Sequence, residues 1–381
     1  MTRGTSEIAI VHDWLTGQRG GEHVLEAVLE LLPGATLFAL THVPGSVAPA
    51  IEEKKPRTSW LSRVPLLRRA PGLALPLLPR AIESLDLRDF EGVLSISHCV
   101  ALGARARGTH LLYSLTPMRY AWDGFEDYAR GAGSLVRGIG EGLRGKLQRW
   151  DREASRRPRA IACISEHVRE RIRRAYEREA RVVFPPVDTD AFGEAGRRLD
   201  RGERFLALGA VRPNKRLDEV ALAFRELRLP LDIVGPGSPR ALERLRELGG
   251  PTVSVLGELP RREVIEKVAR CRALVHAAHE DFGIAPVEAL AAGRPVVAFE
   301  RSGVRESVGE LGVLFGGPVI EGVRRFLERE RDLPGPEVLR ERASLFSKGR
   351  FRESFSSFLR EEGGPAFARA LGPRATGVLA W

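Results

Sequence analysis

Short apolar runs alternate with amphipathic stretches along almost the entire chain. A continuous apolar run of about four to eight residues is typical of a strand that is buried in a parallel sheet. In the first half, such runs occupy residues 7–12, 36–40, 92–97, 109–114 and 160–164. In the second half, they occupy residues 204–209, 231–234, 253–256, 273–277 and 294–299. The alternation predicts an α/β protein with two doubly wound, Rossmann-like domains.

The length and one proline-stiffened link predict where these domains divide. A chain of 381 residues exceeds a single ordinary hydrophobic core. The link runs from Val182 to Asp188, and the domains that we expect on its two sides are residues 1–186 and 187–345. Four phenylalanines at helical spacing predict a last helix at about residues 346–362 whose apolar face packs into a core. Residues 363–381 are expected to form a loose tail.

Composition narrows the class of protein. The chain is 43% hydrophobic and 29% charged, which is typical of a folded globular protein. Its three cysteines are far apart and lack a C-x-x-C pattern, which predicts a reducing compartment and no zinc knuckle. We see no signal-peptide core, and no run approaches the ~20 apolar residues of a membrane-spanning helix. We therefore expect a cytoplasmic protein, either free or peripheral at the inner face of the cell membrane.

The basic charge suggests a partner without naming one. The formal net charge is +10, and 54 of the 60 basic residues are arginine. Arginines are densest between residues 144 and 181, where they form either a solvated helix surface or a contact with anionic membrane headgroups. Residues 44–89 combine proline, arginine and leucine, which suits either a lipid interface or ordinary packed helices. No nucleic-acid-binding pattern accompanies the charge, so no specific nucleic acid is expected as a partner.

The strongest candidate for chemistry lies between residues 273 and 299. An apolar run ends there in a polar loop with Glu280, and Pro286 suits the start of a helix. Ala285 stands at the expected cap, so the first N–H groups of that helix are free to hold an anion. Carboxylates accept hydrogen bonds from hydroxyls, so Glu280 and Glu288 suit a ligand with phosphate between two sugars. The alternative is a solvated loop charge and a carboxylate that favours the helix dipole.

Three further stretches place candidate groups after predicted strands. Gly20 and Gly21 lie at a strand-to-helix turn, where glycine lets a ligand approach the backbone closely. His98 stands at the carboxyl end of a strand, which is where ligands bind in parallel sheets. Lys215 and Arg212 follow the strand at residues 204–209 and suit a diphosphate clamp. The alternatives are a simple turn for the glycines and a structural role for the histidine.

Residues 116–123 cluster aromatic and charged side chains. Such a cluster suits carbohydrate binding, because rings stack on sugar C–H faces and charged groups bind hydroxyls. A packed loop is the alternative. The candidates in this stretch are Arg119, Tyr120, Trp122 and Asp123.

Several of these stretches together resemble family 4 retaining glycosyltransferases of the GT-B fold. The string E-x7-E, with D-F-G-I-A-P-V between its acids and A-L-A-A-G-R-P-V-V-A after them, matches that family's signature. V-H-D-W-L-T-G-Q-R-G-G-E, S-I-S-H-C-V-A-L-G and P-P-V-D are similar to its opening loop, its active-site histidine segment and its domain crossover. T-P-M-R-Y-A-W-D closely resembles a segment of bacterial mannosyltransferases that act on lipid-linked saccharides. The chain departs from the family at Ala210, where many members have arginine.

The resemblance implies a fold and a reaction. It implies two Rossmann-like domains that face across a cleft, with the acceptor bound by the first, the donor by the second, and the last helix crossing back onto the first. The implied enzyme transfers a hexose, foremost mannose from GDP-mannose, to a lipid-linked or polysaccharide acceptor with retention of configuration. Neither a metal ion nor a cofactor other than the nucleotide sugar is expected. Association with a membrane surface would use the basic N-terminal domain.

The resemblance also assigns residues to roles. The implied catalytic residues are Glu280, His98 and Lys215. The implied donor-binding residues are Arg212, Lys215, Asp281, Phe282, Gly283, Ile284, Glu288, Gly20 and Gly21. The implied acceptor-binding residues are Arg119, Tyr120, Trp122 and Asp123.

Two other functions stay open at this point. A related GT-B enzyme would use UDP-glucose or another nucleotide sugar, or would act as an epimerase. A protein of a different class would bind sugar nucleotides or an anionic surface without catalysis.

Overall fold

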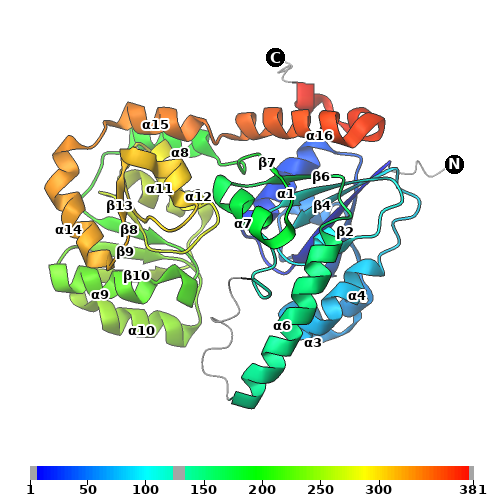
Figure 1. Ribbon diagram of the computed structural model, residues 1–381. Coiled ribbons are helices and arrows are strands. Elements are labelled where there is room, and N and C mark those ends of the chain that lie inside the picture. Colours follow the sequence, from blue (N-terminus) through cyan, green and yellow to red (C-terminus); the bar gives the residue numbers. More distant parts are fainter. Residues whose placement is uncertain (1–6, 123–133, 377–381) are drawn as a thin grey trace. The chain divides into compact units, whose positions relative to one another are not determined.

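The computed structural model describes residues 7–122 and 134–376, with side chains in the first helix after the gap described from residue 142. Two parallel sheets run through the described part of the chain, and each has helices on both faces (Figure 1). The α/β fold class predicted from the alternating pattern is therefore confirmed. The chain divides into a first unit, residues 1–186 with 351–381, and a second unit, residues 187–350.

The first unit is built on a parallel sheet in the order β3-β2-β1-β4-β5-β6-β7. Its strands are β1 (Ile8–Leu15), β2 (Thr36–His42), β3 (Arg57–Thr58), β4 (Gly92–Ser97), β5 (Thr109–Ser114), β6 (Ala160–Cys163) and β7 (Arg181–Val182). Its α-helices are α1 (Gly20–Leu31), α2 (Pro49–Glu52), α3 (Pro65–Arg69), α4 (Leu78–Glu83), α6 (Ser134–Ala154), α7 (Glu166–Tyr176) and most of α16 (Lys348–Ala370). Short 3-10 helices are η1 (Trp60–Arg63), η2 (Pro71–Leu77), η3 (Ala101–Gly103) and η8 (Pro373–Thr376).

The second unit repeats the plan with the strand order β10-β9-β8-β11-β12-β13. Its strands are β8 (Phe205–Leu208), β9 (Leu231–Val234), β10 (Val253–Gly257), β11 (Leu274–His276), β12 (Val296–Phe299) and β13 (Val313–Phe315). Its α-helices are α8 (Thr189–Arg198), α9 (Leu217–Leu227), α10 (Pro239–Gly249), α11 (Arg261–Arg270), α12 (Ile284–Ala291), α13 (Val304–Val308), α14 (Val319–Arg329) and α15 (Pro336–Ser344). Its 3-10 helices are η4 (Pro213–Lys215), η5 (Gly250–Thr252), η6 (Gly309–Leu311) and η7 (Glu330–Asp332).

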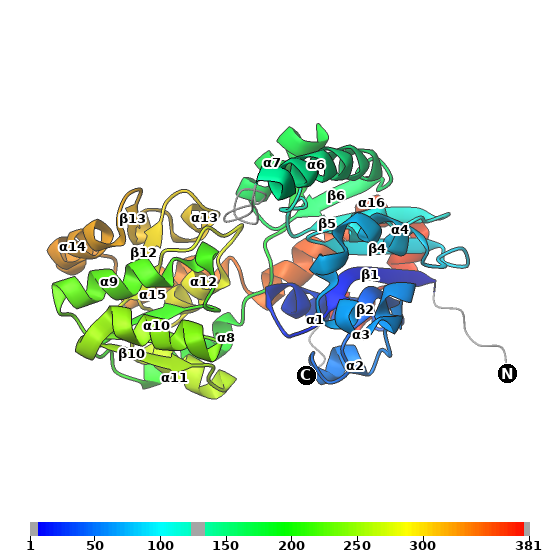
Figure 2. The ribbon, with the colours of Figure 1, turned by 90° about the horizontal axis from the view of Figure 1, so that it is seen from below.

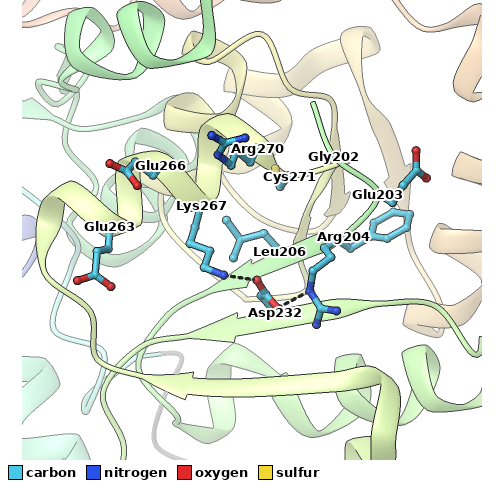
Figure 3. Close-up of a pocket in the computed structure, with 11 residues that line it drawn as sticks. Gly202, Glu203, Arg204, Leu206, Asp232, Glu263, Glu266, Lys267, Arg270 and Cys271 are labelled. Carbon is cyan, nitrogen blue, oxygen red and sulfur yellow. Dashed lines mark hydrogen bonds and ion pairs between the residues drawn. The ribbon is translucent and has the colours of Figure 1, made fainter. Parts of the chain in front are cut away.

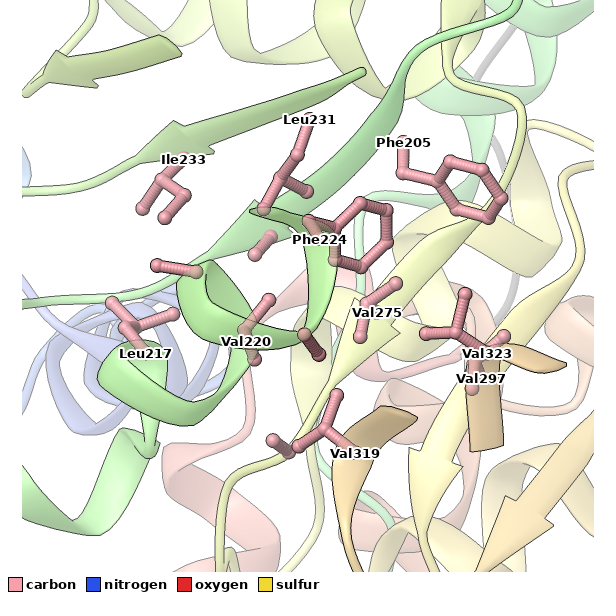
Figure 4. Close-up of a cluster of buried hydrophobic side chains, with 14 of the residues drawn as sticks. Phe205, Leu217, Val220, Phe224, Leu231, Ile233, Val275, Val297, Val319 and Val323 are labelled. Carbon is pink, nitrogen blue, oxygen red and sulfur yellow. The ribbon is translucent and has the colours of Figure 1, made fainter. Parts of the chain in front are cut away.

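Two helix layers enclose the second sheet. Helix α9 contacts both α10 and α14 on one face, and α8, α11, α12 and α15 pack together on the other (Figure 2). Phe224 of α9 and Phe326 of α14 contact Phe205 of β8 through ring pairs with centroids 5.0 and 5.5 Å apart. The surrounding cluster is buried and largely aliphatic (Figure 4). Strands enclosed in this way must be apolar on both faces, which explains their continuous hydrophobic runs.

The C-terminal segment packs on the first unit, and the expected loose tail is wrong for residues 363–376. Helix α16 is kinked at Gly364, where the backbone is not helical and a φ of 69° suits glycine. Beyond this kink, Phe367 is completely buried and would touch a Cβ added at Gly92. Arg369 pairs with Glu91 at 2.7 Å. The buried ring and this ion pair hold in place a segment that we expected to be loose.

Candidate active site

The predicted site residues lie where ligands bind in doubly wound sheets. In such sheets, the binding crevice lies beyond the carboxyl ends of the two adjacent strands whose connections leave in opposite directions. These strands are β1 and β4 in the first unit and β8 and β11 in the second. Gly20 and His98 follow β1 and β4, whereas Lys215 and Glu280 follow β8 and β11. The topology therefore gives each unit a candidate site at its own strand ends.

In the second unit, Lys215 forms an ion pair with Glu280. Each side chain is 20% exposed, so the pair is shielded and still reachable from solvent. Gly209 directly follows β8 with φ of 151°, and a Cβ there would lie 3.3 Å from Cδ of Lys215. The glycine thus provides room for the lysine stem. The structure brings together a cation and a carboxylate that are 65 positions apart in the sequence (280 − 215).

His276 lies beneath this ion pair and was missed in the sequence. Its Nε2 is 3.3 Å from Oε2 of Glu280, and the side chain is buried. Burial, together with the nearby charge of Lys215, lowers the pKa of His276 to about 3. The imidazole is therefore neutral at neutral pH. A lone polar residue in the apolar run at residues 273–277 was the available signal.

The loop that carries Glu280 is anchored on Phe299. The ring of His279 contacts Phe299 at 4.6 Å between centroids, and the guanidinium of Arg216 lies 4.6 Å from the same ring centroid. The backbone N–H of Gly303 donates to the carbonyl of Glu280 at 2.8 Å. Packing and backbone hydrogen bonds therefore set the position of the carboxylate before any ligand arrives.

Helix α12 starts two residues earlier than predicted. It begins at Ile284 with Gly283 as its N-cap, so Ala285 is not the cap and Pro286 is its third residue. Gly283 has φ of 86°, and a Cβ there would lie 2.5 Å from Cγ2 of Val304, so glycine is required on two grounds. The cap makes no side-chain hydrogen bond. The expected uncapped helix start is therefore present, with a different cap residue.

Two predicted donor-binding residues beside this start are buried. Asp281 and Phe282 are 8% and 2% exposed. The ring of Phe282 packs against Phe346 with centroids 5.5 Å apart. Gly303 packs so closely on the backbone of Asp281 that a Cβ would overlap its carbonyl oxygen. For Phe282, the structure shows a packing role that holds the loop in place.

Glu288 lies in the second turn of α12 and is held by Arg261. The carboxylate accepts a hydrogen bond from the Arg261 guanidinium at 2.8 Å, and Glu288 is buried. Arg261 in turn lies over the ring of Phe192, 4.8 Å from its centroid. A ribose diol bound by Glu288 would have to share this carboxylate with Arg261. The arginine was missed because it belongs to a basic stretch with no distinguishing pattern.

The two arginines of the cationic turn after β8 have different roles. Arg216 pairs with Glu219 through two hydrogen bonds of 2.6 and 2.8 Å and stacks on Phe299, so it is structural. Arg212 is exposed at the N-cap of η4. Among the described residues it has no ion-pair partner. It therefore remains available for the diphosphate clamp that we predicted with Lys215.

In the first unit, the two glycines are part of a helix. Gly20 and Gly21 form the first turn of α1, which starts two residues before the expected position. A Cβ on Gly21 would lie 3.1 Å from Leu115 and 3.6 Å from the ring of His12. His12 is buried, and its Nε2 has no hydrogen-bond partner among the described residues. The glycine is thus needed for close packing at the amino end of α1.

Asp13 organises the segment that carries His98. Its buried carboxylate accepts hydrogen bonds from four consecutive backbone N–H groups, residues 98–101, at 2.6 to 2.9 Å. The His98 side chain is 30% exposed, its Nδ1 is 3.1 Å from Asp13, and its ring meets the edge of Trp14 at 4.6 Å. Burial lowers the pKa of His98, and Asp13 opposes this shift. Asp13 was missed because it follows the strand predicted at residues 7–12, whereas β1 continues to Leu15.

The predicted acceptor loop is anchored by its tryptophan. The indole of Trp122 donates to Asp151 at 2.7 Å, and Arg152 lies 5.5 Å from the ring centroid. Tyr120 packs against the core, with its hydroxyl 3.6 Å from where a Cβ on Gly72 would be. Arg119 is half-buried in the turn before Trp122 and is not without a partner. Asp123 lies outside the described residues.

A separate cavity of about 340 Å³ opens at the amino ends of β8 and β9 (Figure 3). Asp232 lies at its base and bridges Lys267 and Arg204, each at 2.7 Å. None of the predicted site residues lines this cavity. Among the described residues, no group of three or more His, Cys, Asp and Glu side chains is arranged to hold a metal ion. Nor does the described part of the chain contain a helix that is long and apolar enough to cross a membrane.

In the comparisons with known sequences, one protein family matches part of the second unit. Residues 202–327 match the family described as "Glycosyl transferases group 1". This region contains Lys215, Glu280 and Glu288. No curated protein matches the chain significantly.

Solved structures show the fold of nearly the whole chain. HepE of Anabaena in complex with UDP has a TM-score of 0.66 at 15% identity and covers 93% of this chain and 100% of its own. Sucrose-phosphate synthase of Thermosynechococcus elongatus has a TM-score of 0.68 at 16% identity, with coverages of 93% and 98%. WaaG, a glycosyltransferase involved in lipopolysaccharide biosynthesis, has a TM-score of 0.55 at 17% identity, with coverages of 89% and 95%.

These likenesses show the fold and support one class of protein. The fold is GT-B, with two parallel-sheet α/β domains. The group 1 match and the structural neighbours together support a GT-B glycosyltransferase.

Proposed function

We propose that the protein is a retaining hexosyltransferase that uses a nucleotide sugar. The observation that carries this proposal is the Lys215–Glu280 ion pair beside the uncapped start of α12. A lysine ammonium and the free N–H groups of a helix start both attract a diphosphate. A carboxylate next to them accepts hydrogen bonds from sugar hydroxyls. The arrangement thus suits the two chemically different halves of a nucleotide-sugar donor.

In the proposed reaction, donor binding opens the ion pair. The diphosphate takes over Lys215, with Arg212 as a second cation, and Glu280 then binds the hydroxyls of the transferred sugar. The bond between the anomeric carbon and the diphosphate oxygen breaks while Lys215 and the helix N–H groups stabilise the leaving charge. The acceptor hydroxyl attacks from the same face, and its proton passes to the leaving phosphate. This arrangement requires no metal ion.

Two donors compete in the proposal. The sequence resemblance favours mannose from GDP-mannose. HepE has been crystallised with UDP and with UDP-glucose, which favours a uridine nucleotide as the second candidate. Because a ligand that binds only the folded state raises its stability, a thermal-shift panel of nucleotide sugars identifies the donor.

The acceptor side of the proposal belongs to the first unit. We assign Arg119, Tyr120 and Trp122 to a lipid-linked or polysaccharide acceptor, and His98 to a hydroxyl of one of the two substrates. The protein would act at the cytoplasmic face of a membrane, where such acceptors are assembled. Its net charge of +10 is consistent with an anionic surface as a partner.

The substitution Glu280→Ala tests the assigned role with the donor that the panel selects. We expect kcat to fall by about 100- to 1000-fold, which is typical for the loss of one group that acts in the transition state. The affinity for the nucleoside diphosphate should stay equal or rise, because Lys215 loses its competing carboxylate. Glu310→Ala, at an exposed glutamate, serves as the matched control. A near-normal kcat for Glu280→Ala would refute the role of this residue.

Product analysis separates the proposed enzyme from its alternatives. A transferase releases nucleotide when donor and acceptor are mixed and forms a larger saccharide. An epimerase converts the donor without an acceptor, and a non-catalytic binding protein does neither. Detection of donor conversion alone, or of no conversion, would contradict the proposal.

A further inference from the structure

The arginine-rich stretch at residues 144–181 is largely engaged within the first unit. Arg144 donates to the carbonyl of Ala121 at 2.9 Å, and Arg152 donates to that of Ala175 at 3.0 Å. Three further arginines are held by the structure around them, namely Arg157, Arg171 and Arg178. Guanidinium groups that are bound to carbonyls and carboxylates have few donors left for phosphate headgroups. This stretch therefore supplies less free charge than its composition indicates.

A different surface combines exposed apolar and basic side chains. Ten large apolar residues are exposed among the described residues, and five of them fall between residues 60 and 77. Leu66 and Leu73 are the most exposed of the ten, at 64% and 67%. The term apolar-basic surface is used below for the following residues: Trp60, Arg63, Val64, Leu66, Arg69, Leu73, Leu77 and Arg80. Except for Val64, which lies between η1 and α3, these residues belong to η1, α3, η2 and α4, and each of these elements contacts the next (α3 and α4 are labelled in Figure 1).

The other face of the same elements is packed into the core. Leu61, Leu78 and Ile82 are completely buried and belong to a cluster with strands β1 and β2. Pro65 and Pro71 occupy first helical positions, where their fixed φ favours the observed turns. The outward side chains are therefore held in place by an anchored backbone. Their exposure is a property of the folded unit.

The charge of this segment has one sign. Residues 54–82 contain seven lysines and arginines and no aspartate or glutamate. Within the described structure, Arg63, Arg69 and Arg80 form no ion pair, and all three are exposed. A surface of this kind complements one that presents negative charge above an apolar layer, as an anionic bilayer does.

The acceptor loop adjoins this surface. The hydroxyl of Tyr120 lies 3.6 Å from where a Cβ on Gly72 would be, and Gly72 immediately precedes the exposed Leu73. Tyr120 is one of the residues that we assign to the acceptor. A lipid-linked acceptor would thus meet its binding loop next to the segment that touches the lipid.

We propose that the apolar-basic surface docks the first unit on a membrane rich in anionic lipid. The leucine and tryptophan side chains enter the boundary between headgroups and acyl chains, while Arg63, Arg69 and Arg80 contact the headgroup phosphates. This inference rests on the proposed function for its link to a lipid-linked acceptor. The docking itself requires neither donor nor turnover.

Vesicle flotation of the full chain tests the docking directly. The probes are vesicles of phosphatidylcholine alone and of phosphatidylcholine mixed with phosphatidylglycerol, at low and high salt. We expect binding to the mixed vesicles that weakens with salt. The double variant Leu66→Gln/Leu73→Gln should bind at least ~100-fold more weakly, at about tenfold for each leucine that leaves the interface. Arg63→Gln/Arg69→Gln should lose about 25-fold, at about fivefold for each charge near the surface.

Matched variants in the second unit control for general changes. Leu327→Gln/Val338→Gln replaces two exposed apolar residues, and Arg240→Gln/Arg331→Gln replaces two exposed arginines. Both should bind vesicles like the wild type. All variants should keep wild-type turnover on a water-soluble acceptor, since none of these positions belongs to the proposed site.

The outcomes separate the two proposals. Absence of binding to mixed vesicles, or equal losses for the surface variants and their controls, would overturn the docking. Binding that depends on the surface in a protein without transferase activity would support the docking and count against the proposed function. If the surface instead serves a protein partner with an acidic face, the chain will not float with pure lipid vesicles, and the membrane proposal is then wrong.

Discussion

Replacement of Asp13 by asparagine should destabilise the first unit and displace His98. Oδ1 of the carboxylate accepts from the N–H groups of Val100 and Ala101, and Oδ2 accepts from those of His98 and Cys99. Asparagine has the same shape but keeps one oxygen, so its amide group faces two of these four donors. Asp13 is completely buried, so bulk solvent does not reach the position of the lost acceptor.

The size of the destabilisation follows from the two backbone N–H groups that lose their acceptor. A buried backbone N–H without an acceptor costs about 1 to 3 kcal/mol, so we expect a loss of about 3 kcal/mol in the free energy of unfolding. For a unit of this size, that corresponds to a fall of about 6 to 12 °C in the melting temperature. Turnover should fall as well, because the segment at residues 98–101 loses the group that positions it.

Tryptophan fluorescence provides a selective assay. All five tryptophans lie in the segments that form the first unit, so their emission reports on its unfolding with little contribution from the second. Asp86→Asn is the matched control, since Asp86 is exposed and pairs only with the neighbouring exposed Arg88 among the described residues. We expect no measurable change for the control. An Asp13→Asn midpoint equal to that of Asp86→Asn would refute the argument that this carboxylate organises the segment.

Two further predictions concern pH and metal ions. Burial raises the pKa of Asp151 to about 7, although hydrogen bonds from Trp122 and Tyr176 favour the carboxylate. The stability that the protonated acid contributes is therefore full below its usual pKa of about 4 and is lost as pH rises towards 7. As pH rises from about 4 to about 7, the free energy of unfolding of Asp151→Asn should increase relative to that of the wild type, and above this range the difference should stay constant. Denaturant unfolding at each pH measures this difference. A difference that does not change with pH would contradict the raised pKa of Asp151. Addition of EDTA should leave transferase activity unchanged, whereas a strict metal requirement would contradict the clamp of Lys215 and helix N–H groups.

The local pattern of apolar and polar residues predicted much of the fold. The apolar runs predicted the strands because a strand between two helix layers must be apolar on both faces. Element ends were less accurate: β1 continues to Leu15, and α12 begins at Ile284. Both errors arose at polar or glycine residues whose packing partners are distant in the sequence. Asp13 stays in a strand because it caps the backbone at residues 98–101, and Gly283 caps α12 because Val304 excludes a side chain.

The sequence by itself determined the α/β class, the motif residues and the order in which they occur. It did not determine that β8 lies beside β11, which is what brings Lys215 to Glu280. Nor did it separate the arginines at residues 144–181, largely bound to neighbours in the first unit, from the exposed ones between Arg63 and Arg80. Composition and spacing describe neighbours along the chain. Strand pairing, burial and ion pairing depend on residues that become neighbours only when the chain folds, and so the tertiary structure decided them.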